Sequence, residues 1–144
     1  MPVVSMAGCI FCSLQKSEGD IIYKDDWCYV VPDRYPISRG HILVIAVDHY
    51  SDMLSTPEDV IGHMFIIAKR YAKINVAVNE ATGVNIGTNV GKSAGQAIMH
   101  FHIHVIPRYD GQERIFDFGK NKELLPEEMK DMARILKGAA AKSQ

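Results

Sequence analysis

Residues 98–106 read IMHFHIHVI, in which His100, His102 and His104 alternate with apolar side chains. Successive side chains of a β-strand point to opposite faces, so residues two apart share a face at a spacing of about 6.5–7 Å. The run therefore predicts a strand, ended by Pro107, with three imidazoles on one face. The other face would carry Met99, Phe101, Ile103 and Val105.

Three co-facing histidines have several interpretations. They can be polar residues on a solvated face, although an uninterrupted repeat of imidazoles is a poor way merely to keep a face polar. An H-x-H pair can also bind a metal ion through two ring nitrogens. The outer pair, however, is about 13–14 Å apart between Cα atoms, so the three are not expected to share one ion. At least one histidine is expected to have another task.

The loop before this strand, Val90–Ala97, is rich in small residues. Gly91 and Gly95 would let backbone N–H groups approach a phosphate closely, and Lys92 and Ser93 add a cation and a hydroxyl. Such a loop is common by itself. Joined directly to three co-facing histidines, it favours phosphoryl chemistry.

The rest of the chain predicts more strands and two helices. A helix is expected after Thr56, which can cap it, with apolar residues at spacings of three and four from Val60 to Val78. A second helix begins near Leu125. Because the strands cluster and one long helix intervenes, an α+β fold with an antiparallel sheet is favoured. The expected additional strands are Asp20–Tyr23, Trp27–Val31, His41–Val47 and Gly83–Asn89.

The composition fits one domain over residues 1–144, with a flexible N-terminus at 1–8 and a C-terminal extension carrying a helix at 110–144. Lys and Arg total 16 against 17 for Asp and Glu, which argues against a basic face for nucleic acid. No apolar run has the roughly 18–20 residues of a membrane span, and no basic residue opens a secretory signal. We expect a cytoplasmic protein with neither a nucleic-acid nor a membrane partner.

The chain has 3 cysteines, an odd number that argues against a disulfide framework. Cys9 and Cys12 form C-x-x-C, which is half a zinc site or a redox pair, and the lack of a surrounding βαβ unit disfavours a thioredoxin-like pair. Cys28 lies in an apolar run and is expected to be a small buried hydrophobe. His63 borders the apolar stripe of the long helix and is expected to be a half-buried or surface residue of that helix.

The stretch Gly95–Ile106 resembles the signature of the histidine triad (HIT) family, H-φ-H-φ-H-φ-φ with φ apolar. The resemblance covers nearly the whole chain, because the residues Cys9–Cys12, Arg39–Ile45, His49 and Pro107-Arg108 lie in register with the same pattern. It implies a five-stranded antiparallel sheet with one long helix and a C-terminal helix, a homodimer, and activity as a nucleotide hydrolase or transferase.

The resemblance also implies roles for single residues. His102 would attack the α-phosphorus and form a transient nucleotidyl-histidine, which a neutral imidazole can do without a separate base. His104 would hydrogen-bond phosphate or leaving-group oxygens, and His41 would support the site from the neighbouring strand. The nucleotide would be bound by Asp33 at the ribose hydroxyls, and by Asn89, Gly95, Gln96 and His104 at the phosphate end.

Some members of this family complete a structural zinc site with two histidines at the positions of His49 and His100. With Cys9 and Cys12 they would supply the four ligands that such a site needs, and His102 would stay free for chemistry. The alternative is a vacant, reduced C-x-x-C. Without zinc, we expect a loose N-terminus and not an inactive enzyme.

Ala97 departs from the family pattern, in which Ser or Thr often follows the motif glutamine, so an altered leaving-group preference or a slower rate is expected. The expected substrates are adenine-type nucleotides: dinucleoside polyphosphates, nucleoside phosphoramidates or adenylylated adducts. Two other function classes stay open. One is a purine-nucleotide-binding or sensing module with incidental hydrolysis, and the other is a metalloenzyme in which a metal contacts His102 or His104.

Overall fold

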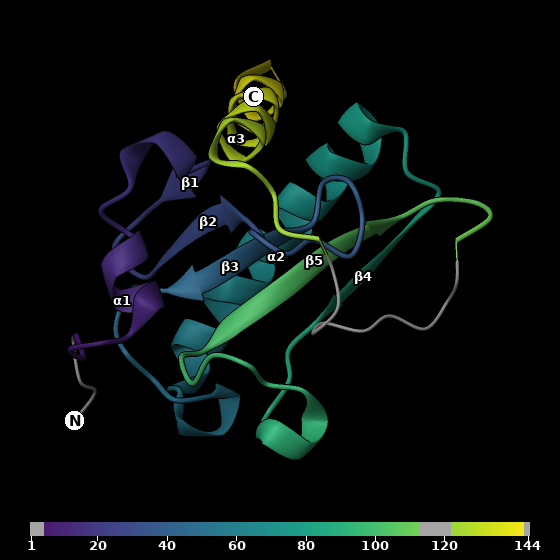
Figure 1. Ribbon diagram of the computed structural model, residues 1–144. Helices are drawn as coiled ribbons and strands as arrows, with labels where there is room; N and C mark the ends of the chain where they lie inside the picture. The colour runs from purple at the N-terminus through teal and green to yellow at the C-terminus, as the bar shows by residue number, and fades with distance from the viewer. Residues whose placement is uncertain (1–4, 113–121, 143–144) are drawn as a thin grey trace.

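The computed structural model describes residues 5–112 and 122–142. Its centre is a five-stranded antiparallel sheet in the order β1-β2-β3-β5-β4 (Figure 1). This confirms the predicted antiparallel α+β fold, whereas the homodimer stays a prediction. The strands are β1 (Tyr23–Lys24), β2 (Cys28–Pro32), β3 (Ile42–Ala46), β4 (Gly83–Gly87) and β5 (His102–Arg108).

Helices cover both faces of the sheet. The long helix α2, Glu58–Asn79, packs against β3 and β5 on one face, and the short helix α1, Ile10–Leu14, lies on the opposite face. The helix α3, Pro126–Lys142, contacts α2 and β2 (Figure 1). Short 3-10 helices lie at Glu18–Asp20, Met53–Ser55 and Lys92–Ala94. Among the described residues, no helix is both long and apolar enough to cross a membrane.

The predicted apolar stripe of α2 is buried in its middle, where Met64, Ile67 and Tyr71 join the core. The same core holds the apolar side chains of β5, such as Ile103 and Val105, so the opposite face of β5 is left for the imidazoles. The end of the stripe, Val78, is exposed.

The predicted cap of α2 is wrong. The hydroxyl of Thr56 donates to the carbonyl oxygen of Asp52 at 2.7 Å, and the helix begins after Pro57 without a side-chain cap. The prediction failed because the Thr56 hydroxyl is turned back toward the short 3-10 helix Met53–Ser55, away from the first N–H groups of α2.

The triad strand begins later and ends later than predicted. It starts at His102, because the N–H of Phe101 donates to Tyr50 outside the sheet, and Met99 is exposed instead of lying on the core face. Pro107 does not end it. Its carbonyl points to the β3 side and accepts from the Ser38 hydroxyl, because the pairing with β3 has already stopped at Val105. The N–H that proline lacks would point to the same side, where β3 presents no acceptor.

The first hairpin is also shorter than predicted, and Asp20 belongs to a 3-10 helix. β1 pairs with β2 over two residues only, Tyr23 with Val30 and Lys24 with Tyr29. The remaining strands differ from their predicted bounds by one or two residues at their ends, where ladders fray.

Gly40 fixes the turn that leads into β3 and His41. Its φ is +89°, and a Cβ there would lie 2.5 Å from Oδ1 of Asn75, whose Nδ2 donates to the Gly40 carbonyl at 2.6 Å. Only glycine adopts this backbone conformation without strain and leaves room for that amide.

We predict that Gly40→Ala lowers the free energy of unfolding by about 3 kcal/mol, because it adds a positive-φ strain and displaces a buried hydrogen bond. Urea denaturation followed by circular dichroism measures the change. Gly62→Ala is the matched control: nothing lies within 4 Å of its Cβ position in α2, so about 0.5–1 kcal/mol of added stability is expected. Equal stability of Gly40→Ala and the wild type would contradict this account.

Candidate active site and metal cluster

His102 is buried and lines a cleft on the α1 side of the sheet. Its Nδ1 lies 2.7 Å from the carbonyl oxygen of His100. A carbonyl only accepts hydrogen bonds, so Nδ1 carries the ring proton and Nε2 keeps its lone pair. Burial lowers the pKa of His102 because the charged ring would lose its hydration. The ring is therefore neutral at pH 7, with one nitrogen in the state that a nucleophile requires.

His104, His41 and Asp33 form a hydrogen-bonded chain beside this ring. The N–H of Ile37 donates to Nδ1 of His41 at 3.0 Å, so the proton of His41 is on Nε2. That Nε2 lies 3.0 Å from Nδ1 of His104 and 3.2 Å from Oδ2 of Asp33. When Nδ1 of His104 accepts the hydrogen bond from Nε2 of His41, the ring proton of His104 is on Nε2, which is then a donor. The ring centroids of His104 and His102 are 5.0 Å apart.

Burial determines the protonation states of His41, His104 and Asp33. It lowers the pKa of His41 to about 3 and that of His104 to about 2, with smaller contributions from neighbouring rings. It raises the pKa of Asp33. Because His41 is neutral at pH 7, its contact with Asp33 is a hydrogen bond from a neutral ring and not an ion pair.

The cleft has a volume of about 360 Å³ and runs across three strands. His104 on β5 is opposite Leu43 on β3, which is opposite Val31 on β2, and Asp33 follows the end of β2. Ala97 lines the cleft, so the departure from the family pattern lies at the site itself. The apolar lining consists mainly of Ile10, Phe11, Leu14, Leu43, Ile98 and Met129.

Gln96 lies outside this lining, and its amide is occupied by the protein. Its Oε1 accepts from the N–H of Gly91 at 2.8 Å, and its Nε2 donates to the carbonyls of Ser51 at 2.8 Å and Ile98 at 3.0 Å. Gln96 therefore shapes the glycine loop, and its contact with a nucleotide stays a prediction. Its neighbour Gly95 lines the cleft, with a φ of +92°.

Asn89 is placed beside the loop and not in the main cleft. Its Nδ2 lies 3.5 Å from the Gly95 carbonyl, and its side chain borders a smaller hollow that His104 also lines. A contact between Asn89 and a nucleotide stays a prediction.

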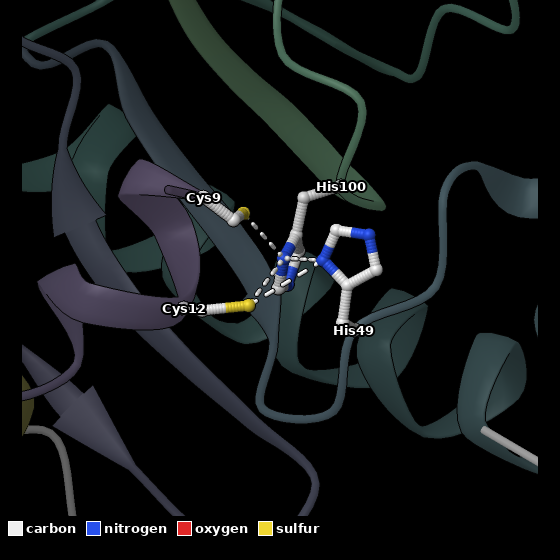
Figure 2. A group of neighbouring side chains, drawn as sticks. All are labelled: Cys9, Cys12, His49 and His100. Carbon is white, nitrogen blue, oxygen red and sulfur yellow. Dashed lines mark hydrogen bonds between the residues drawn. The ribbon is translucent and has the colours of Figure 1, made fainter. Parts of the chain in front are cut away.

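Cys9, Cys12, His49 and His100 meet in a second cluster (Figure 2). One ligand atom from each lies within 4.8 Å of all the others. The Cys9 Sγ is 3.3 Å and the Cys12 Sγ 3.6 Å from Nδ1 of His100, and the two Nδ1 atoms are 3.1 Å apart. Two sulfurs and two imidazole nitrogens at this spacing match the donor set and shape of a tetrahedral zinc site.

The surroundings of the cluster also suit a metal. Nε2 of His100 lies 2.7 Å from the carbonyl oxygen of Ala46 and must donate to it, so Nδ1 turns its lone pair toward the sulfurs. The backbone N–H of Met6 donates to the Cys12 sulfur at 3.4 Å. All three cysteines are free thiols, which excludes a Cys9–Cys12 disulfide in this structure.

One polar cluster had no signal in the sequence. On the α2 side of the sheet, Oδ2 of Asp25 accepts from Nε2 of His63 at 2.6 Å and from the Tyr23 hydroxyl at 2.7 Å. Burial raises the pKa of Asp25, but these bonds and two backbone N–H donors outweigh it and bring it to about 2. The pair fastens the first hairpin to α2, with His63 half-buried and Cys28 fully buried as predicted.

The comparisons with known proteins point to one family. The sequence model of the HIT domain matches residues 15–111. An uncharacterized HIT-like protein of Saccharolobus solfataricus is 38% identical over 121 residues, which are 80% of this chain and 85% of that protein. Adenylylsulfatase HINT3 of Arabidopsis thaliana is 38% identical over 102 residues, which are 69% of this chain and 52% of that protein.

Solved structures agree. The crystal structure of a zinc-bound histidine triad family protein from Mycobacterium smegmatis superimposes with a TM-score of 0.81 at 31% identity, covering 94% of this chain and 95% of that chain.

We predict that the protein loses stability between pH 7.5 and pH 5. The folded pKa values of His41 and His104, about 3 and about 2, lie below the ordinary value of 6.5. The unfolded chain therefore binds protons in this range that the folded chain does not, which lowers the free energy of unfolding by about 1–2 kcal/mol for each ring. Urea denaturation at both pH values measures the loss, and His104→Gln should reduce it. A wild type equally stable at both pH values would refute the assignment of neutral rings.

Proposed function

The chain belongs to the HIT domain family, and on this premise we propose that it is a nucleotide hydrolase or nucleotidyl transferase that cleaves its substrate at the α-phosphate through His102. The observation that carries the proposal is the bond from Nδ1 of His102 to the His100 carbonyl, which leaves Nε2 unprotonated on a ring that lines the cleft.

In the proposed reaction, Nε2 of His102 forms a bond to the α-phosphorus as the bond from phosphorus to the leaving oxygen or nitrogen breaks. The leaving group departs with that electron pair and takes a proton from water. The nucleotidyl group on His102 then passes to water or another acceptor, and the ring returns to its neutral form. The Nδ1–H bond to His100 stabilises the positive charge that the ring carries in the intermediate.

The hydrogen-bonded side chains of His104, His41 and Asp33 support this step. The single Nε2–H of His41 is proposed to be shared between Nδ1 of His104 and Oδ2 of Asp33, so that Nδ1 of His104 accepts and Nε2 of His104 donates to phosphoryl or leaving-group oxygens. Donors fixed before the reaction stabilise developing charge without reorganisation, and burial strengthens them. His104 is thus proposed to act by hydrogen bonding, in keeping with its low pKa.

The nucleoside is proposed to occupy the apolar part of the cleft. Asp33 uses one oxygen for the N–H of Tyr35 and the other for His41, which leaves acceptor sites for ribose hydroxyls. The similarity to a protein named as an adenylylsulfatase supports an adenylyl group as the transferred unit. The proposed substrates are dinucleoside polyphosphates, nucleoside phosphoramidates or adenylylated adducts.

One geometric observation favours a second candidate, a metalloenzyme. One ligand atom each of Asp33, His41 and His104 lies within 4.8 Å of the other two, a spacing that could hold a metal ion. A metal there would displace the proton between the two rings. Loss of turnover on chelation in Cys12→Ser, a variant expected to lack the metal of the cysteine–histidine cluster, and its recovery on adding metal would favour this candidate over the nucleophilic histidine.

We predict that His102→Ala lowers the turnover of an adenosine phosphoramidate at least a thousandfold while AMP binding is retained, because only the nucleophile is lost. Intact-mass measurement after a high-pH quench should find an AMP-sized adduct in the wild type and none in the variant. His63→Ala is the matched control, since this histidine lies on the α2 side of the sheet and should keep full turnover. Turnover that persists in His102→Ala refutes the proposal, whereas tight AMP binding without turnover in the wild type identifies a nucleotide-binding module.

We also propose that Cys9, Cys12, His49 and His100 hold a structural zinc ion, which would fix α1 to the start of β5. The purified protein is predicted to contain one zinc per chain by elemental mass spectrometry. Cys12→Ser should lose the metal and become sensitive to proteases near α1 while substrate turnover persists, and Cys28→Ala, outside the cluster, should keep the metal. Turnover that declines in proportion to zinc removal would count against a purely structural ion.

A further inference from the structure

Met129 connects α3 to the cleft. It lies in the first turns of the helix, is buried and lines the cleft. Ala133 and Leu136, further along the same helix face, belong instead to the core between the sheet and α2. The apolar face of α3 therefore contacts the cleft through Met129 at its beginning and the core beside α2 through Ala133 and Leu136.

The approach to α3 is fastened to the same part of the cleft. The N–H of Leu124 donates to the carbonyl oxygen of Arg34 at 2.7 Å, and the Tyr35 hydroxyl donates to Oε2 of Glu123 at 2.6 Å. Arg34 and Tyr35 line the cleft and directly follow Asp33, the proposed ribose ligand. These bonds hold the beginning of α3 next to the nucleoside end.

The order of the strands gives the direction of a bound nucleotide. His102 lies on β5, Leu43 lies on the neighbouring strand β3, and Asp33 follows the end of β2, the strand beyond it. Neighbouring strands are about 4.8 Å apart, so the line from His102 to Asp33 runs across the sheet. α3 contacts β2, the strand that Asp33 follows. A nucleotide with its phosphorus at His102 and its ribose at Asp33 would thus direct its base toward Met129.

The position of Met129 relative to the family region is also informative. The catalytic candidates His41, His102 and His104 lie inside residues 15–111, which match the HIT domain, whereas Met129 lies outside them. The chemistry is therefore built from the region shared with the family, and a wall of the base end comes from a segment beyond it.

We propose that Met129 of α3 is a specificity-determining residue that closes the base end of the cleft and favours purine over pyrimidine nucleotides. This inference rests on the proposed function. A purine extends further from the ribose than a pyrimidine, so it reaches Met129, and the flexible thioether packs well against an aromatic ring.

The test compares the binding of AMP and CMP to the wild type, Met129→Ala and Met132→Ala by isothermal titration calorimetry. Met129→Ala should bind AMP about tenfold more weakly and CMP within twofold of the wild type, because it removes apolar contact that only the purine makes. Met132→Ala is the matched control, as Met132 on the same helix packs against the core away from the cleft and should leave both affinities unchanged.

A second measurement does not depend on a variant. With methyl-labelled methionine, the Met129 resonance should shift when AMP is added to the wild type, and the Met132 resonance should not. If His102-dependent turnover is present but AMP leaves the Met129 resonance and the Met129→Ala affinity unchanged, the role of α3 is wrong and the proposed function stands. If the wild type neither binds nor turns over adenine nucleotides, both proposals fall.

Discussion

The bond from Nδ1 of His102 to the carbonyl of His100 is the interaction on which the site depends, because it decides which nitrogen of His102 carries a proton. The side chain of the same His100 donates to the Ala46 carbonyl and turns its other nitrogen to the cysteine sulfurs. The ring of Phe11, which lies between Cys9 and Cys12 in the sequence, packs edge-on against His100 and His102. The cysteine–histidine cluster and the proposed nucleophile are thus joined by one short segment of chain, from His100 to His102.

Burial gives the histidines beside the cleft their chemistry. Imidazoles in water are partly charged near neutrality, whereas burial keeps His41 and His104 neutral. One hydrogen bond, between Nε2 of His41 and Nδ1 of His104, joins the two rings. Neutral donors of fixed direction can bind an anionic phosphoryl group through dipoles, and the low local dielectric makes each such bond stronger than in water. The same burial lowers the free energy of unfolding in acid, because the unfolded chain binds protons that the folded protein does not.

Much of this architecture could be predicted from the sequence, because alternation and helical periodicity are local properties. The resemblance to the HIT family anticipated the meeting of Cys9, Cys12, His49 and His100, which no local pattern could show. Tertiary contacts decided the rest. The strand start at His102 depends on a distant acceptor for Phe101, and the amide of Gln96 is occupied by a carbonyl 45 residues away. The pairing of Asp25 with His63 and the reach of α3 into the cleft have no sequence signature of their own.

The cleft walls come from segments far apart in the chain: α1, the end of β2, the glycine loop, β5 and α3. Any compound that fills the cleft must join these segments, and it can do so only in the folded protein. Thermodynamic linkage then adds about 2.7 kcal/mol of stability at a ligand concentration one hundred times the dissociation constant. The melting temperature therefore reports occupancy of the cleft whatever reaction follows, which makes thermal-shift screening of metabolite collections a direct route to the natural ligand.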